Sequence, residues 1–262
     1  PPVSLPSYSS PTELLRDRSE GTAKILCMIF GILGTVVLLC TGIGFLVLGL
    51  LLVGWILSFW TAAKIKAGAV LVSEQSWPEL HKIVEESKLK LGMTDTKAYV
   101  IQDSTFNAFA TRLAGRNFVI LNSGAVDTIM RKGTIDDLRF LVGHECGHVV
   151  MGHVGFWGGL VPKVSELYFY PLYAWYRRCQ ERSADRCGLW CAGNRSTAHR
   201  CIAVLAGGSE MGSRLDIHAA AAQWNSVRDE TWVSITRFFS EYPHTTERII
   251  LVNQSADELR VP

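Results

Sequence analysis

The most distinctive chemical pattern in the chain is His144-Glu145-Cys146-Gly147-His148, which matches H-E-x-x-H. Residues four apart on an α-helix lie on one face, so the imidazoles of His144 and His148 can point at one metal ion. Zinc suits two neutral imidazoles, and a catalytic zinc site needs a third protein ligand and an open position for water. Glu145 stands beside the two ligands and could take a proton from that water. The pattern therefore predicts metal-assisted hydrolysis.

This pattern needs a helix, and the residues before it predict one. Thr134-Ile-Asp-Asp137 matches a capping box. Apolar residues then recur at helical spacing: Leu138, Leu141, Val142 and Val149. Gly143 and Gly147 each weaken a helix by about 1 kcal/mol relative to alanine, which predicts that another backbone passes close on their side. The alternative for the two histidines is ordinary packing in a core.

A second helix, expected over residues 174–192, offers the third ligand. Glu181 and Asp185 share one face of it, and like charges at this spacing weaken a helix by a few tenths of a kcal/mol unless a cation or a histidine lies between them. Zinc would be that cation. Glu181 would then be the third ligand, and Asp185 would accept a ring N–H from a ligand histidine. The alternative is a solvated charged face on which Arg177 pairs with Glu181.

The composition bounds the class of protein. The chain has 262 residues, of which 48% are hydrophobic and only 19% are charged. The net charge of +2 is small, and no basic run is interleaved with aromatic residues, so nucleic acid is not an expected partner. The seven cysteines have no regular spacing, which favours reduced thiols in a reducing compartment over a disulfide scaffold.

The N-terminal part of the chain divides into a tail and an apolar segment. Residues 1–24 are rich in proline and serine and then in mixed charges, which predicts a flexible tail. Residues 25–60 carry no charge, and one helix of that length would be about 54 Å long, beyond a hydrocarbon core of about 30 Å. We therefore expect a transmembrane helical hairpin that turns at Thr41-Gly-Ile-Gly44. A secretory signal, which would be shorter, and a buried core hairpin are the alternatives.

Basic residues flank both ends of the hairpin, and by the positive-inside rule both flanks lie in the cytoplasm. They are Arg16, Arg18 and Lys24 before it, and Lys64 and Lys66 after it. We therefore expect an integral membrane protein, with the lipid bilayer as a partner and residues 61–262 as a cytoplasmic metallopeptidase domain. Oligomeric state leaves no signal in the sequence.

The soluble part mixes helices with a few strands. A helix is expected from Pro78 until Gly92 stops it, and strands are expected over residues 98–101, 106–111 and 117–121. The last two would form a hairpin or meander beside the zinc helix. Such an edge strand could hold an extended peptide, with the side-chain amide of Asn107 as a contact, or it could be an ordinary edge. The aromatic residues of 154–176 could lie on the membrane surface, close over the site, or pack in a core.

These motifs, taken together, resemble those of the HtpX-like proteases and the CAAX prenyl protease, which are membrane zinc metallopeptidases. The resemblance covers residues from about 70 to 250. It rests on four motifs: Asn107-Ala-Phe-Ala110, His144-Glu145-x-x-His148, Glu181-x-x-x-Asp185 and Glu247-Arg248-Ile249. It implies one Zn²⁺ per chain on His144, His148 and Glu181, with Glu145 as the general base. It also places Asp185 and Arg248 around the ligands, and Asn107, Ala108 and Phe109 along the substrate cleft.

One position departs from the family pattern. Family members usually carry a His-Pro pair before the last motif, whereas this chain has Tyr242-Pro243 followed by His244. A tyrosine hydroxyl can donate a hydrogen bond to an oxyanion, so Tyr242 and His244 are both candidates for that catalytic role.

The resulting expectation is an α+β fold: a mostly helical zincin-type metallopeptidase domain with a small β-hairpin or meander, preceded by the transmembrane hairpin. The expected function is zinc-dependent cleavage of peptide bonds in protein or peptide substrates, in membrane-protein or misfolded-protein quality control. The expected location is the bacterial inner membrane, with the peptidase domain on the cytoplasmic side. A catalytically silent peptide-binding adaptor and a structural membrane protein with a fortuitous motif are the alternatives from other classes.

Overall fold

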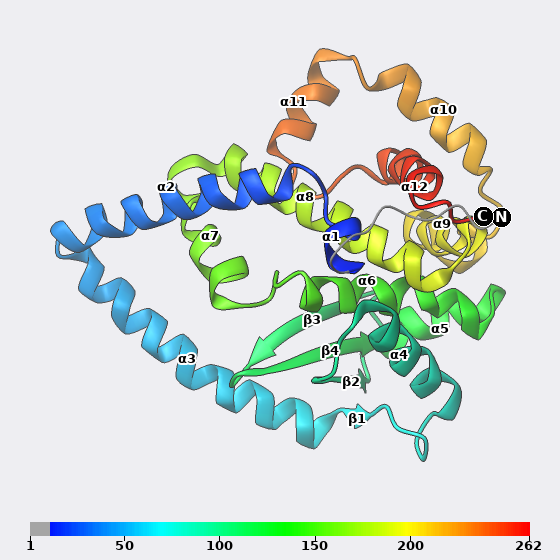
Figure 1. The fold of residues 1–262 in the computed structure, drawn as a ribbon, viewed down its shortest axis with the longest axis horizontal. Coiled ribbons are helices and arrows are strands. Elements are labelled where there is room, and N and C mark those ends of the chain that lie inside the picture. Colours follow the sequence, from blue (N-terminus) through cyan, green and yellow to red (C-terminus); the bar gives the residue numbers. More distant parts are fainter. Residues whose placement is uncertain (1–10) are drawn as a thin grey trace.

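The computed structural model describes residues 11–262, apart from the side chains of Val47, Leu48 and Leu51. Within this range the protein is mostly helical and has one small sheet (Figure 1). The long helices α6 (Leu138–Val150) and α8 (Glu166–Ala192) lie together at the centre and carry the metal motifs. The mixed helical and strand content agrees with the predicted α+β class.

Four strands form the sheet in the order β1-β2-β4-β3. They are β1 (Val70–Leu71), β2 (Thr96–Ile101), β3 (Ala108–Leu113) and β4 (Arg116–Asn122). The β3–β4 pair is antiparallel and turns at Ala114-Gly115, where both residues have positive φ (48° and 76°). The β2–β4 pair is parallel, with Thr96 opposite Asn117. β3 is thus an edge strand, and it lies on the side of the sheet that faces α6 (Figure 1).

The crossing of α6 and α8 is unusually close, as the two glycines predicted. A Cβ on Gly143 would lie 2.5 Å from Cβ of Cys191, and one on Gly147 would lie 2.8 Å from Cβ of Cys187. On the other helix, a Cβ on Gly188 would lie 2.7 Å from the carbonyl oxygen of Phe140. The missing side chains let the two backbones approach, and this approach brings Glu181 up to the histidines.

The apolar segment forms two helices, α2 (Glu20–Cys40) and α3 (Ile43–Gly68), preceded by the short α1 (Pro11–Leu15). The chain turns at Gly42, whose φ is 77°, and the two helices then diverge as the arms of a V (Figure 1). Among the described residues, α2 is long and apolar enough to cross a membrane. The transmembrane hairpin itself stays a prediction.

The flexible tail predicted for residues 1–24 is wrong for its second half, while residues 1–10 lie outside the described part. Leu15 and Glu20 are fully buried, and Asp17 pairs with Arg182 on α8 at 2.9 Å. Mixed charges had suggested a solvated segment. They instead meet complementary groups on α8, and these contacts order residues 11–24.

Residues 154–176 pack along α2, and of this segment Val154 alone is among the residues that line the cavity with His144 and His148. They contain a π-helical turn, η2 (Phe156–Leu160), the short α7 (Val161–Val164) and the start of α8, which is kinked at Phe169. The hydroxyl of Tyr168 donates to the carbonyl oxygen of Gly34 on α2 at 2.8 Å. Trp157 remains 62% exposed. The contacts of this segment are thus largely with α2, and its closing over the site stays a prediction.

Further helices enclose the central pair. They are α4 (Pro78–Leu91), α5 (Ser123–Lys132), α9 (Arg195–Gly212), α10 (Ile217–Val227), α11 (Thr231–Phe239) and α12 (Thr245–Leu259). The predicted helix from Pro78 ends at Gly92 as expected, because Gly92 has a φ of 69°. α4 packs on α6, and α12 packs on α8, where it brings Arg248 towards the metal motifs.

Candidate metal centre

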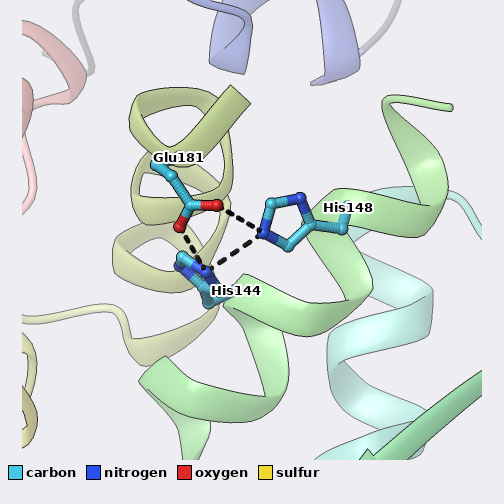
Figure 2. A group of neighbouring side chains, drawn as sticks. All are labelled: His144, His148 and Glu181. Carbon is cyan, nitrogen blue, oxygen red and sulfur yellow. Dashed lines mark hydrogen bonds and ion pairs between the residues drawn. The ribbon is translucent and has the colours of Figure 1, made fainter. Parts of the chain in front are cut away.

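Three side chains from α6 and α8 converge on one point (Figure 2). Nε2 of His144 and Nε2 of His148 lie 3.2 Å apart. The carboxylate of Glu181 lies 3.5 Å from Nε2 of His144 and 3.6 Å from Nε2 of His148. The structure therefore brings together the three residues that were predicted as ligands.

This donor set fits a zinc ion. With bonds of about 2.0–2.1 Å, two ligands of a tetrahedral zinc lie roughly 3.3–3.4 Å apart. The three separations observed here, 3.2, 3.5 and 3.6 Å, bracket that value. Although burial alone would raise the pKa of Glu181, the two histidines and Arg177 hold it below its usual value. Glu181 thus remains anionic, as a metal ligand must be.

His144 is held from behind by Asp185, as the helix spacing predicted. Nδ1 of His144 lies 2.8 Å from Oδ1 of Asp185, which also accepts from Nη2 of Arg248 at 2.6 Å. Burial would raise the pKa of Asp185, but Arg248 and His144 hold it below its usual value. An ionised Asp185 accepts a hydrogen bond from Nδ1–H of His144, so that the lone pair on Nε2 is free for a metal.

His148 is held differently, by a second imidazole, that of His153. α6 ends at Val150, and Gly152 then takes a left-handed conformation with φ of 76°. The chain turns back, and Nδ1 of His153 comes to lie 2.9 Å from Nδ1 of His148. A helix that continued beyond Val150 would place residue 153 about 140° around from His148, whereas the turn at Gly152 brings the two rings together. His153 is thus the hydrogen-bond partner of a candidate ligand.

Glu145 is on α6 and only 5% exposed, and its side chain reaches the edge strand β3. Burial raises the pKa of its carboxyl to about 7, while the attraction of His144 and a backbone hydrogen bond from Ala110 of β3 oppose this rise. A carboxyl group with a pKa near neutrality can both accept and release a proton, which is what a general base and acid must do.

The three candidate ligands and Glu145 line a cavity of about 580 Å³. Residues of the edge strand and the loop before it form one wall, and these include Asn107, Ala108 and Phe109. Phe109 is 40% exposed, so its side chain is available to a bound molecule. The three residues expected along a substrate cleft thus line the cavity that contains the metal ligands.

Comparison with known proteins finds similarity to peptidases in the part of the chain that contains His144, Glu145 and His148. Residues 74–157 match the family described as peptidase family M48. A relative named protease HtpX homolog, from Streptococcus gordonii, is 32% identical over 82 residues, which are 31% of this chain and 27% of the relative. A second with the same name, from Streptococcus pneumoniae (strain Hungary19A-6), is 30% identical over 82 residues, 31% of this chain and 26% of the relative. The resemblance to the HtpX-like metallopeptidases is confirmed.

The match to these relatives spans only about a quarter of their length, and the M48 match ends before Glu181. Membership of Glu181 and Asp185 in the site therefore rests on the geometry described above. No solved structure gives a significant match.

Tyr242 stands at the position where the HtpX-like family was expected to carry a histidine. It lies at the mouth of the cavity. Its side chain is 54% exposed, and its hydroxyl accepts a hydrogen bond from Nη2 of Arg177 at 3.2 Å. The same Nη2 lies 3.3 Å from Oε1 of Glu181. Arg177 thus joins the metal ligand to the tyrosine. Its position four residues before Glu181 was the available signal, and we had linked it only with the solvated alternative.

His244 was the second candidate for the oxyanion role, and the structure places it away from the site. It is not among the residues that line the cavity, although Pro243 and Thr245 are. Its ring packs against Trp224 on α10, with the ring centroids 5.8 Å apart. His244 is the residue directly before α12, and its ring points towards α10 and away from the cavity.

Proposed function

We propose that this protein is a membrane-anchored zinc-dependent endopeptidase. The observation that carries the proposal is the convergence of His144, His148 and Glu181 on one point, with Glu145 beside them in the same cavity. The M48 match and the name of the relatives, protease HtpX homolog, support the same class of reaction.

Each residue of the site has a part in this proposal. His144, His148 and Glu181 would hold the metal, which when bound polarises a carbonyl group and lowers the pKa of water. Glu145 accepts a proton from the attacking water and later gives it to the leaving amine. The hydroxyl of Tyr242 is directed to the cavity mouth, where it can donate a hydrogen bond to the developing oxyanion.

The edge strand β3 supplies the substrate site. A peptide in extended conformation can pair with the free side of β3 and pass along Asn107 to Ala110, whose backbone also contacts Glu145. Main-chain pairing of this kind depends little on side-chain identity, so the proposal includes broad recognition of unfolded segments. This suits quality control of membrane or misfolded proteins.

The membrane location rests on α2 and α3. The apolar side chains along both helices are exposed to a large extent, for example Leu33 (59%), Phe45 (76%) and Trp60 (68%). Such apolar surface is unfavourable in water and favourable in a bilayer. With basic residues at both flanks, the metal site would lie on the cytoplasmic side, at the bacterial inner membrane.

Metal content and proteolysis of the wild type and of Glu145→Gln test the proposal. Glutamine keeps the size of the side chain but cannot accept the proton. We expect both proteins to bind one zinc per chain, and only the wild type to cleave an unfolded substrate such as casein. A wild type that lacks zinc, or a variant that cleaves as fast as the wild type, would contradict the proposal.

The same pair of proteins tests the catalytically silent adaptor. An adaptor on this fold would bind the unfolded substrate with the wild type and the variant alike, and neither would cleave it. The intact set of Glu145, Glu181 and both histidines disfavours this alternative.

A further inference from the structure

Behind His148 lies a line of buried polar groups that runs from the metal ligands to the first residue of α2. We propose that His153 and Glu20 are positioning residues of the metal centre, and that Glu20 orients His148 through His153. The inference rests on the proposed function in one respect, namely that His148 is a metal ligand.

The first link joins the two imidazoles. Nε2 of His148 faces Nε2 of His144 and the carboxylate of Glu181, so in the metal-bound protein its Nδ1 carries the proton. That proton can only be donated to an acceptor, and Nδ1 of His153 lies 2.9 Å away. The hydrogen bond therefore fixes His153 as the tautomer that is protonated on Nε2.

The second link joins His153 to the N-terminal helix. Nε2 of His153 lies 3.3 Å from Oε2 of Glu20, and the two side chains are 1% and 0% exposed. The contact does not reach hydrogen-bond geometry. A carboxylate nevertheless favours the N–H on the side of the ring that faces it, and so supports the same tautomer.

Glu20 is itself fixed in place. Its Oε1 pairs with Arg16, its Oε2 accepts from the hydroxyl of Ser183 on α8, and Arg16 also donates to the carbonyl oxygen of Met151 at 3.2 Å. A fully buried carboxylate is strongly unfavourable without such partners. Glu20 is such a buried carboxylate, and it lies beside a histidine that contacts a proposed metal ligand. This position suggests that Glu20 has a specific role.

The two ligand histidines are thus supported in parallel ways. His144 is backed by the carboxylate of Asp185, which an arginine, Arg248, holds in turn. His148 is backed by His153, and beyond it by the carboxylate of Glu20 with Arg16. The support of His148 thus includes one more imidazole, that of His153, than the support of His144. Its carboxylate, that of Glu20, comes from the N-terminal segment. The start of the proposed membrane anchor is therefore part of the metal centre.

A graded series of variants in the full-length protein tests this. His153→Leu removes the acceptor for His148, while His153→Asn keeps an acceptor near the position of Nδ1 but does not reach Glu20. Glu20→Gln keeps the shape and removes the charge. We expect the zinc affinity to fall by about 10–100-fold for His153→Leu, as for other lost partners of metal ligands, and by less for the other two.

Zinc dissociation constants are measured by competition with a chromogenic chelator, and the thermal unfolding of each metal-free protein is recorded beside them. Arg200→Gln is the matched control, because it breaks the ion pair with the buried carboxylate of Asp137, at 2.5 Å, and this pair has no contact with the metal ligands. We expect this control to lower thermal stability and to leave zinc affinity unchanged. The Co²⁺-substituted proteins add a spectroscopic readout of ligand geometry.

The outcomes separate the two proposals. If the wild type binds zinc and all three variants bind it as tightly, the inference about Glu20 and His153 is wrong and the proposed function stands. If affinity falls in the control as much as in the series, the contacts are merely structural and the inference is again wrong. A wild type that binds no zinc overturns both.

Discussion

Gly147 of α6 faces Cys187 of α8 so closely that a Cβ on the glycine would lie 2.8 Å from Cβ of the cysteine. This contact lies one residue before His148 and sets the distance between the two helices that share the metal. The separation of the helices and the geometry of the metal site are therefore linked.

Gly147→Ala should consequently destabilise the protein and weaken metal binding together. Extra volume at a tight contact typically costs about 1–3 kcal/mol, because backbone or side chains must move. Gly54→Ala on α3, where nothing lies within 4 Å of the new methyl group, is the control and should change little. Chemical unfolding and zinc titration of the two variants check this. Equal behaviour of the two would show that α6 and α8 tolerate the added volume.

Removal of the metal should abolish proteolysis and lower stability. A ligand that binds only the folded protein stabilises it by about 2.7 kcal/mol at 100 times its dissociation constant. We expect a chelator to lower the melting temperature and to stop cleavage, and added Zn²⁺ to restore both. The His144→Ala variant should show neither response. A chelator effect that persists in this variant would point to a metal elsewhere.

Asp185→Asn should weaken zinc binding, because the amide cannot act as an ionised acceptor for Nδ1 of His144 and it leaves Arg248 without its partner. We expect a loss of about 10–100-fold in zinc affinity. Since Asp185 and Arg248 are in contact, the double variant Asp185→Asn with Arg248→Gln should lose less than the sum of the two single variants. Additive losses would mean that the two residues act separately.

Tyr242→Phe should lower kcat with little change in KM. Loss of one donor to an oxyanion commonly lowers kcat by about 10²–10³-fold. His244→Ala should leave kcat near that of the wild type, because His244 packs against Trp224 outside the cavity. Steady-state kinetics on one peptide substrate decide between them. If His244→Ala shows the larger loss, the assignment of the two residues must be reversed.

Thiol labelling tests the membrane arrangement. Cys40, beside the turn between α2 and α3, is exposed, and the other six cysteines are buried. Burial raises the pKa of Cys191 to about 11 and that of Cys201 to about 12, which makes these thiols still less reactive. A membrane-impermeant maleimide should label Cys40 from the side opposite the metal site, and Cys40→Ser should remove that signal. Labelling from the side of the metal site alone would contradict a hairpin that crosses the bilayer.

Local patterns explain why much of the site was predictable. His144, Glu145 and His148 lie on one helix, so spacing alone determines their relation. The capping box at Thr134 and Asp137 forms as predicted, and it begins the short 3-10 turn η1 (Ile135–Asp137) that leads into α6. The two glycines in the helix also predicted that another backbone passes close, and that backbone is α8.

The parts that could not be predicted depend on chain reversals and distant contacts. The position of His153 follows from the left-handed turn at Gly152, and a helical projection fails beyond the end of the helix. The role of Asp17 and Glu20 depends on partners in α8 more than 160 residues away. The sheet order is likewise not a local property, because β4 pairs with β2 and the intervening strand β3 lies at the edge.

The position of β3 at the border of the sheet has a consequence for the choice of substrate. A partner for this strand must offer its own main-chain amides, and in a folded protein most of these are already engaged. The rate at which a folded substrate is cut would then follow the fraction of time that its segment spends locally open. Under this scheme the rate of cleavage would depend on the free energy of local unfolding of each substrate. Two proteins with the same cleavable segment would then differ in lifetime according to the stability of the fold around that segment.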